Sequence, residues 1–182
     1  MGKGIAKEIG RIGGIGARQI VGSLDASAMR FGIVVSRFND ELTNVLAMSA
    51  YQCLEKNGAS PETIDLVRVP GAYEIPGVAE KMAASKRYDA LIVLGVVVEG
   101  ETQHAQMIID STGQAMLDIA CRHQIPVINE IVGVRSWAQA EARCLGAPPR
   151  EGALAERSGE NTRGWYAAEA AIETARVYKQ IG

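Results

Sequence analysis

At 182 residues the chain can bury one well-formed core but is short for two ordinary domains. Its formal net charge of −2 excludes the basic surplus that nucleic-acid-binding domains usually carry. No stretch approaches the roughly 20 apolar residues that a membrane-spanning helix needs, and the glycine-rich beginning, interrupted by Glu8, does not fit a signal peptide. We therefore expect a cytoplasmic protein without nucleic-acid or membrane partners.

Residues 1–22 are rich in glycine and isoleucine and show no helical or strand periodicity. They are either a flexible tail or an apolar segment that lies on a neighbouring subunit. The second alternative explains the isoleucines, because a solvent-exposed tail rarely contains so many apolar residues. We place an N-terminal extension at residues 1–22 and one folded domain at residues 23–182.

The cysteines and histidines do not form a metal-binding pattern. Cys53, Cys121 and Cys144 are odd in number, widely spaced and without a C-x-x-C motif, so we expect buried structural thiols in a reducing compartment. His104 and His123 lie at spacings unsuitable for completing a zinc site with them. No metal is expected.

Strand and helix patterns alternate along the chain. Apolar, β-branched runs predict strands over residues 31–36, 64–69, 90–94 and 125–132. Helical patterns predict helices over residues 41–56, 76–86, 102–123, 137–144 and 163–179. Asn39 or Asp40 is expected to cap the first helix, Asn57-Gly58 to end it, and Ser136 to cap the fourth. The alternation predicts an α/β three-layer sandwich around a four-stranded parallel sheet.

Ligands of parallel sheets bind at the carboxyl ends of the strands. The predicted loops at that edge are residues 36–40, 70–76, 95–104 and 129–136. The third of these precedes a long helix, and a helix N-terminus with Gly100-Glu101-Thr102 suits an anion such as phosphate. His104 in the first helical turn is either a solvated side chain or an acid–base group that titrates near neutrality.

Other residues of these loops also have two interpretations. Phe38 either covers the core or offers a platform for stacking a planar ring. Glu74 either interacts favourably with the helix dipole or accepts hydrogen bonds from a heterocycle, beside the free backbone groups of Ala72 and Tyr73. Arg143 is either an exposed charge or a bidentate phosphate ligand. From the residues alone we expect an α/β protein that binds a small phosphorylated ligand.

Five segments resemble the lumazine synthase family together, from about residue 23 to the end. They are Ser36-Arg37-Phe38-Asn39, Val69-Pro70-Gly71-Ala72-Tyr73-Glu74-Ile75-Pro76, residues 95–104, Ala142-Arg143 and Arg163-Gly164-Trp165. The resemblance implies a flavodoxin-like strand order. It also implies condensation of 5-amino-6-(D-ribitylamino)uracil with 3,4-dihydroxy-2-butanone 4-phosphate to 6,7-dimethyl-8-ribityllumazine, phosphate and water. It implies neither cofactor nor metal.

The same resemblance assigns roles to individual residues. His104 is the catalytic residue that moves protons, Phe38 stacks on the pyrimidine, and Arg143 grips the phosphate. The full set of implied substrate-binding residues is Phe38, Ala72, Tyr73, Glu74, Val96, Val97, Val98, Glu101, Thr102, Asn129, Arg143 and Arg163. The resemblance further implies a homopentamer whose pockets lie between subunits, with Asn129 and Arg143 supplied by the neighbour.

Several positions depart from the pattern of the family. Glu99, Gln103, Ala105, Asn129 and Glu130 stand where arginine, proline, phenylalanine, an aromatic residue and glycine are usual. These departures leave two alternatives open: a non-catalytic flavin- or lumazine-binding protein, or an enzyme for another amine and carbonyl phosphate. Residues 147–161 are also longer than the usual turn before the last helix, so we expect pentamers or decamers instead of a sixty-subunit shell.

Overall fold

The computed structural model describes residues 16–145 and 162–182. Four parallel strands form one sheet in the order β2-β1-β3-β4, which confirms the expected flavodoxin-like arrangement. The strands are β1 (Phe31–Ser36), β2 (Ile64–Val69), β3 (Ala90–Val98) and β4 (Val127–Val134).

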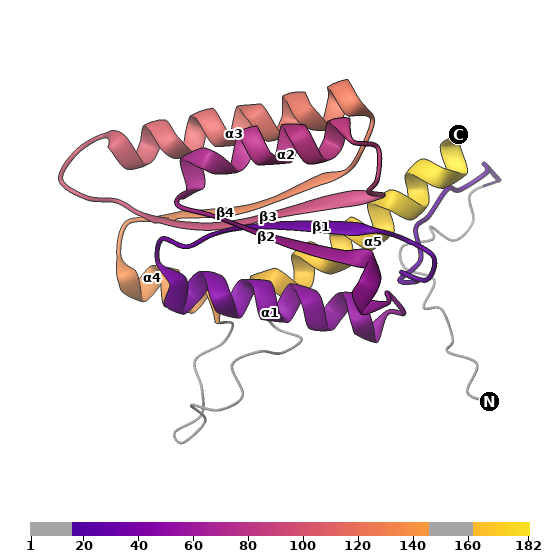
Figure 1. The fold of residues 1–182 in the computed structure, drawn as a ribbon, viewed down its shortest axis with the longest axis horizontal. Coiled ribbons are helices and arrows are strands. Elements are labelled where there is room, and N and C mark those ends of the chain that lie inside the picture. The colour runs from indigo at the N-terminus through magenta and orange to yellow at the C-terminus, as the bar shows by residue number, and fades with distance from the viewer. Residues whose placement is uncertain (1–15, 146–161) are drawn as a thin grey trace, which may run out of the picture.

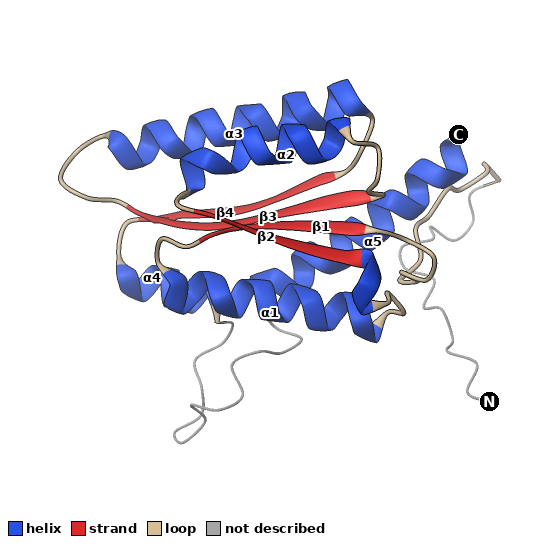
Figure 2. Cartoon of the chain, viewed as in Figure 1, coloured by secondary structure: helices blue, strands red, loops and turns tan. Residues whose placement is uncertain are grey.

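Helices cover both faces of this sheet and complete the predicted three-layer sandwich. They are α1 (Asp40–Lys56), α2 (Ile75–Ala84), α3 (His104–His123), α4 (Trp137–Cys144) and α5 (Arg163–Ile181), with 3₁₀ turns at Pro61–Thr63 and Ala72–Glu74. Figure 1 shows α2 and α3 on one face and α1, α4 and α5 on the other, and Figure 2 shows the same layers by type. None of these helices is long and apolar enough to cross a membrane.

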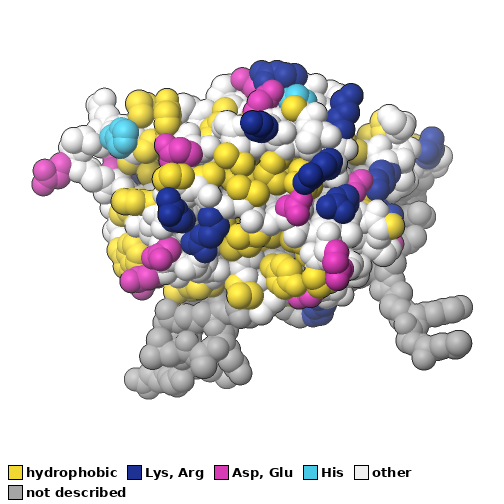
Figure 3. Space-filling model, in the orientation of Figure 1, with side chains coloured by type: hydrophobic (Ala, Val, Ile, Leu, Met, Phe, Trp, Pro, Cys, Tyr) yellow, Lys and Arg dark blue, Asp and Glu magenta, His cyan; other side chains and the backbone are white. Residues whose placement is uncertain are grey.

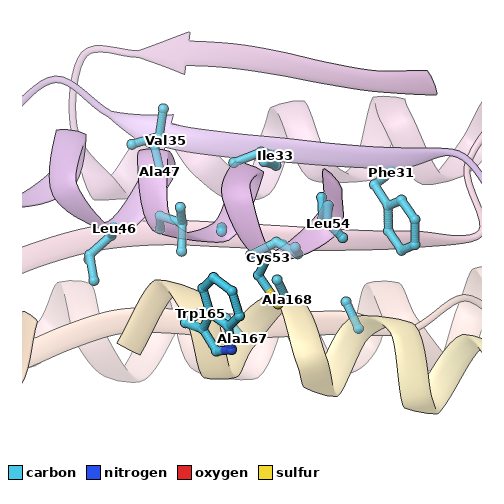
Figure 4. Close-up of a cluster of buried hydrophobic side chains, with 14 of the residues drawn as sticks. Phe31, Ile33, Val35, Leu46, Ala47, Cys53, Leu54, Trp165, Ala167 and Ala168 are labelled. Atoms are coloured by element: carbon cyan, nitrogen blue, oxygen red, sulfur yellow. The ribbon is translucent and has the colours of Figure 1, made fainter. Parts of the chain in front are cut away.

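Each face of the sheet has its own hydrophobic core. The central strand β1 is buried at every residue, whereas the edge strand β2 is only partly covered, as expected for a strand with one neighbour. Figure 4 shows the core beneath β1, where α1 and α5 pack alongside each other and bury Leu46, Leu54 and Trp165. The β2 edge faces the viewer in Figure 3, with a belt of hydrophobic side chains across it; Leu66 of β2 is 46% exposed.

Strand β3 is longer than the sequence pattern predicted, whereas β4 has the predicted length but begins and ends two residues later. They pair in register from Leu91 with Val127 to Val98 with Val134, so the strand continues past the expected end at Leu94. The extension of β3 depends on tertiary structure, because β4 supplies the hydrogen-bond partners of the valine run that ends the strand. Residues 95–98 and 133–134 therefore belong to strands, and their interpretation as loop residues was wrong. Residues 129–132, which were expected both at the end of a strand and in the loop after it, belong to the strand.

Two of the three helix ends that the sequence assigned to particular residues are confirmed. Asn57 ends α1 and is followed by Gly58 at φ 100°, and the Ser136 side chain accepts a hydrogen bond from the Gln139 N–H at the start of α4. The prediction that Asn39 or Asp40 caps α1 was wrong. Asn39 occupies the N-cap position, but its side chain makes no capping bond.

The prediction of three buried thiols was correct for two. Cys53 and Cys144 are buried, and burial raises the pKa of the Cys144 thiol to about 11. Cys121 is exposed on α3, because its helical position faces away from the sheet, so that part of the prediction was wrong.

Part of the predicted N-terminal extension is described. The backbone of Gly22 lies against Glu173 of α5, and the Gln180 side chain donates to the Val21 carbonyl at 2.8 Å. Val21 and Gly22 thus lie against the last helix, whereas residues 1–15 and the long segment 147–161 lie outside the described residues. The domain boundary at residue 23 stays a prediction.

Candidate active site

A cavity of about 420 Å³ opens at the carboxyl edge of the sheet. Its size suits a small organic ligand, for which pockets of roughly 300–1,000 Å³ are usual. Three chain segments that are distant in sequence meet around it. The lining residues are Phe38, Gly71, Ala72, Tyr73, Glu74, Val96, Val97, Val98, Gly100, Thr102, His104, Ala105 and Ile108.

The floor of this cavity is the end of β3. Pairing between β1 and β3 stops at Val35 with Leu94, whereas β3 continues to pair with β4 as far as Val98. Beyond Leu94, the side of β3 that faces β1 therefore meets no strand. Backbone N–H and C=O groups on this side that have no protein partner are available to a ligand with donors and acceptors in one plane.

Phe38 forms one wall and stands on an anchored turn. Its side chain is 67% exposed, so it does not fold back over the core. The Arg37 N–H donates to the Val69 carbonyl at 2.8 Å, and the Phe38 N–H donates to the Pro70 carbonyl at 3.1 Å. An exposed aromatic ring on a fixed backbone can stack on a planar ligand with little loss of conformational freedom.

The second wall is the 3₁₀ turn Ala72–Glu74, which leads directly into α2. Ala72 is buried, whereas Tyr73 and Glu74 are exposed toward solvent at the mouth of the cavity. Glu74 occupies the N-cap position of α2 without a side-chain capping bond, so its carboxylate can accept hydrogen bonds from a ligand.

The third wall is the start of α3. His104 is the first residue of this helix and is exposed, and Thr102 lies two residues before it on the same wall. Orphan N–H groups and the positive end of the helix dipole gather at this point, which favours a bound anion. Ala105, the next residue, is buried and small. Glu101 lies in the same loop but does not line the cavity.

Other predicted site residues lie elsewhere in the chain. Arg143 lines a separate cavity of about 400 Å³ with Gly133, Val134, Arg135, Gln139 and Ala142. Asn129 lies in the middle of β4, opposite Val93, where its side chain accepts from the Ile131 N–H at 3.0 Å. Within one chain, the structure does not bring Arg143 or Asn129 into the cavity of His104.

Arg163 is engaged by a residue that departs from the family pattern. Its guanidinium donates from Nε and Nη2 to the two carboxylate oxygens of Glu130, at 2.9 and 2.6 Å. The Glu130 side chain is only 11% exposed, so the ion pair is partly shielded from water. Bidentate pairs of this kind are strong and fix the guanidinium plane.

A second departure is also paired. The Glu99 carboxylate lies 3.8 Å from Nε of Arg135, although both side chains are more than half exposed. The Glu99 N–H donates to the Val134 carbonyl, which fixes the first residue after β3. Sequence reasoning missed Arg135, because an arginine before a helix start gives no signal of its partner.

A larger cavity of about 620 Å³ lies at the opposite edge of the sheet. Two ion pairs involve its lining: His123 is 2.8 Å from Glu80, which lies outside the cavity, and Lys179 is 2.7 Å from Asp89. The hydrogen bond from His123 holds the pKa of the Glu80 carboxyl below its usual range. This agrees with a structural role for His123. Within residues 16–145 and 162–182, no three His, Cys, Asp or Glu side chains group as metal ligands.

The fold and the cavity define a class of protein. It is a flavodoxin-like α/β protein with a small-molecule site at the carboxyl edge, between an exposed aromatic ring and a histidine at a helix start. Sequence comparison then identifies the family. The family model described as 6,7-dimethyl-8-ribityllumazine synthase matches residues 28–179, and the chain belongs to this family.

Curated relatives with that name align with most of the chain. The synthase of Clostridium kluyveri is 35% identical over 160 residues, which are 88% of this chain and 96% of the relative. The synthase of Chlorobaculum tepidum is 35% identical over 166 residues, 90% and 98% of the two chains. The synthase of a Polaromonas species is 42% identical over 120 residues, 66% and 78% of the two chains.

Proposed function

We propose that this chain catalyses formation of 6,7-dimethyl-8-ribityllumazine. The substrates are 5-amino-6-(D-ribitylamino)uracil and 3,4-dihydroxy-2-butanone 4-phosphate, and phosphate and water are released. One observation carries the proposal: in a member of this family, Phe38, the free edge of β3 and His104 surround a single cavity of suitable size. The reaction is a condensation, an elimination and a ring closure without net oxidation, so the proposal includes no cofactor.

The pyrimidine substrate is planar and carries donors and acceptors along its rim. We infer that its ring stacks on Phe38 while its polar rim meets the end of β3 at Val96, Val97 and Val98, where the backbone groups of Val98 face the open side. Ala72, Tyr73 and Glu74 close the opposite side of the cavity, where the Glu74 carboxylate accepts from ring N–H groups.

His104 is the proposed proton carrier. Attack of the amine on the carbonyl, loss of water and enolisation before phosphate elimination each move a proton near neutral pH, and histidine suits such steps. The phosphate lies at the start of α3, near Glu101 and Thr102, where the orphan N–H groups favour an anion.

Arg143, the cation that binds the phosphate in this proposal, comes from a neighbouring subunit. Support comes from its place on a separate cavity, because the phosphate site of one chain has no arginine in its lining. A head-to-tail ring places the Arg143 cavity of one subunit against the His104 cavity of the next. In this proposal Asn129 of β4 comes from the same neighbour, and Arg163 of α5 is a further substrate-binding residue. A fixed guanidinium stabilises the charge that develops on the leaving phosphate.

The direct test is a two-substrate assay that follows the fluorescence of the lumazine product. His104→Ala is expected to lower kcat by about 10²–10⁴-fold, the range typical of lost acid–base catalysis. His123→Ala is the matched control, because it removes the other histidine at the far edge of the sheet and leaves kcat unchanged. No product above the spontaneous rate, or tight lumazine binding without turnover, would refute the proposal.

Subunit complementation tests the shared pocket. His104→Ala and Arg143→Ala chains are each expected to be inactive, and an equal mixture, refolded together, regains about a quarter of wild-type activity. Recovery occurs because about one pocket in four then combines the intact His104 of an Arg143→Ala chain with the intact Arg143 of a His104→Ala chain. A pentamer has a mass of about 97 kDa, five times the 19.4 kDa chain. A mass near a megadalton would contradict the expectation of a pentamer or decamer.

A further inference from the structure

Asn39 has an unusual backbone and an unexpected side-chain partner. It lies between Phe38 and α1 with φ 60° and ψ 47°, in the left-handed region that residues other than glycine, asparagine and aspartate rarely adopt. Although it occupies the N-cap position of α1, its amide donates instead to the Val96 carbonyl at 2.9 Å. The side chain therefore bridges the Phe38 turn and β3 instead of serving the helix.

The acceptor of this bond lies where β3 has lost its neighbour. The N–H groups of Leu91 and Glu99 both bond to the β4 side, at Pro126 and Val134. Because backbone groups of successive strand residues point to alternate sides, Val96 and Val98 direct theirs to the β1 side. Pairing with β1 stops at Leu94, so the Asn39 amide takes the place of a strand partner at Val96. Val98 is the next residue whose backbone faces that side.

The other hydrogen bonds of the turn reach a different strand. Arg37 and Phe38 donate to the carbonyls of Val69, the last residue of β2, and of Pro70, which follows it. Among the described bonds of residues 37–39, the Asn39 amide is the link to β3. It thus sets the position of the Phe38 turn relative to the strand end that forms the cavity floor.

We propose that Asn39 is a positioning residue for the pyrimidine substrate. Its amide fixes the separation between the Phe38 ring and the free backbone edge of β3 at Val98, so that one planar heterocycle meets both. The inference rests on the proposed function, since it takes the ribitylaminouracil as the ligand. Recognition at two points is sensitive to such spacing, and a displacement of about 1 Å is enough to weaken it strongly.

Asn39→Asp tests the amide with little change of shape. Aspartate tolerates the left-handed backbone and is a favourable N-cap residue beside the helix dipole, but its carboxylate cannot donate to the Val96 carbonyl. We expect an increase of about tenfold in KM for ribitylaminouracil and in the dissociation constant of the fluorescent lumazine product, the size of one lost hydrogen bond. KM for the butanone phosphate stays within about twofold, since that substrate does not stack on Phe38.

Two further variants separate positioning from stability. Asn57→Asp removes a similar amide bond, from Asn57 to the Cys53 carbonyl at 2.8 Å, at the other end of α1. It is expected to leave both KM values within about twofold of wild type. Asn39→Gly adopts the left-handed backbone without strain and also lacks the amide, so it reproduces the KM increase of Asn39→Asp.

The outcomes distinguish this inference from the function beneath it. Wild-type turnover with an unchanged pyrimidine KM in Asn39→Asp and Asn39→Gly overturns the positioning role alone. The same role is overturned by equal increases in both KM values, or by a pyrimidine KM that rises as much in Asn57→Asp. A wild-type chain that neither forms nor binds the lumazine overturns the proposed function and the positioning role together.

Discussion

Replacing Gly164 with alanine is expected to destabilise the protein, although alanine is the better helix former. Gly164 is the second residue of α5 and is buried against α1. An alanine Cβ at this position would lie 2.1 Å from the Leu46 carbonyl oxygen and 2.8 Å from its carbon. Both are backbone atoms of a packed helix, as Figure 4 shows for the α1–α5 contact, so no side-chain rotation relieves the overlap.

The expected magnitude follows from two opposing effects. Glycine inside a helix costs roughly 0.5–1 kcal/mol relative to alanine, which favours the variant. Overpacking costs roughly 1–3 kcal/mol and more when nothing can move. Relief here needs α5 to shift by about 1 Å away from α1, which loosens Trp165 and Ala168 in the core. We expect a net loss of about 2 kcal/mol, or ~4–8 °C in Tm for a chain of this length.

Urea unfolding followed by circular dichroism measures the change, at one fixed protein concentration because assembly contributes to stability. Gly113→Ala is the matched control. Gly113 lies inside α3 with no atom within 4 Å of an added Cβ, so alanine there is expected to stabilise by roughly 0.5–1 kcal/mol. If Gly164→Ala is as stable as wild type while Gly113→Ala behaves as expected, the close α1–α5 contact is refuted.

Three further outcomes follow from burial and charge. Cys121 alone is expected to react with a thiol reagent in the native protein, whereas Cys53 and Cys144 react only after unfolding, as counted by absorbance. Burial raises the pKa of Cys144 from 9.0 to about 11, so the free energy of unfolding falls as pH rises between these values. In unfolding curves measured at alkaline pH, Cys144→Ala is expected to show a smaller fall over this range. The His123 hydrogen bond lowers the pKa of Glu80, so the ionised carboxylate stabilises the fold above pH 4.5 and this stabilisation is lost as pH falls further. Glu80→Gln is expected to remove this part of the loss of stability in acid.

The sequence predicted the layers of the fold because their signals are local. Strands buried on both faces produce continuous apolar runs, as at residues 31–36, and right-handed crossovers leave few ways to connect them. The ends of β3 and β4 were not predictable in this way. Whether residues 95–98 form a strand depends on β4, a partner about 35 residues further along the chain.

The same contrast holds in the cavity. Phe38, Glu74 and His104 were predicted because each lies beside a helix start that the sequence itself indicates. The partner of Asn39 was missed because an asparagine before a helix normally predicts a cap, and its actual acceptor, Val96, is 57 residues away. A capping rule describes the commonest partner within a few residues and contains no information about a strand end that lacks a neighbour.

The ion pair between Glu130 and Arg163 helps to decide which arginine binds the phosphate. Arg163 already donates two hydrogen bonds to the Glu130 carboxylate, and this pair is close to neutral as a unit. A guanidinium in such a pair attracts a phosphate dianion less than an unpaired one, yet keeps donors for uncharged hydroxyl groups. The pair therefore suits the ribityl chain of one substrate better than the phosphate of the other. In the shared pocket that we propose, the charge of the butanone phosphate is left to Arg143 and the start of α3.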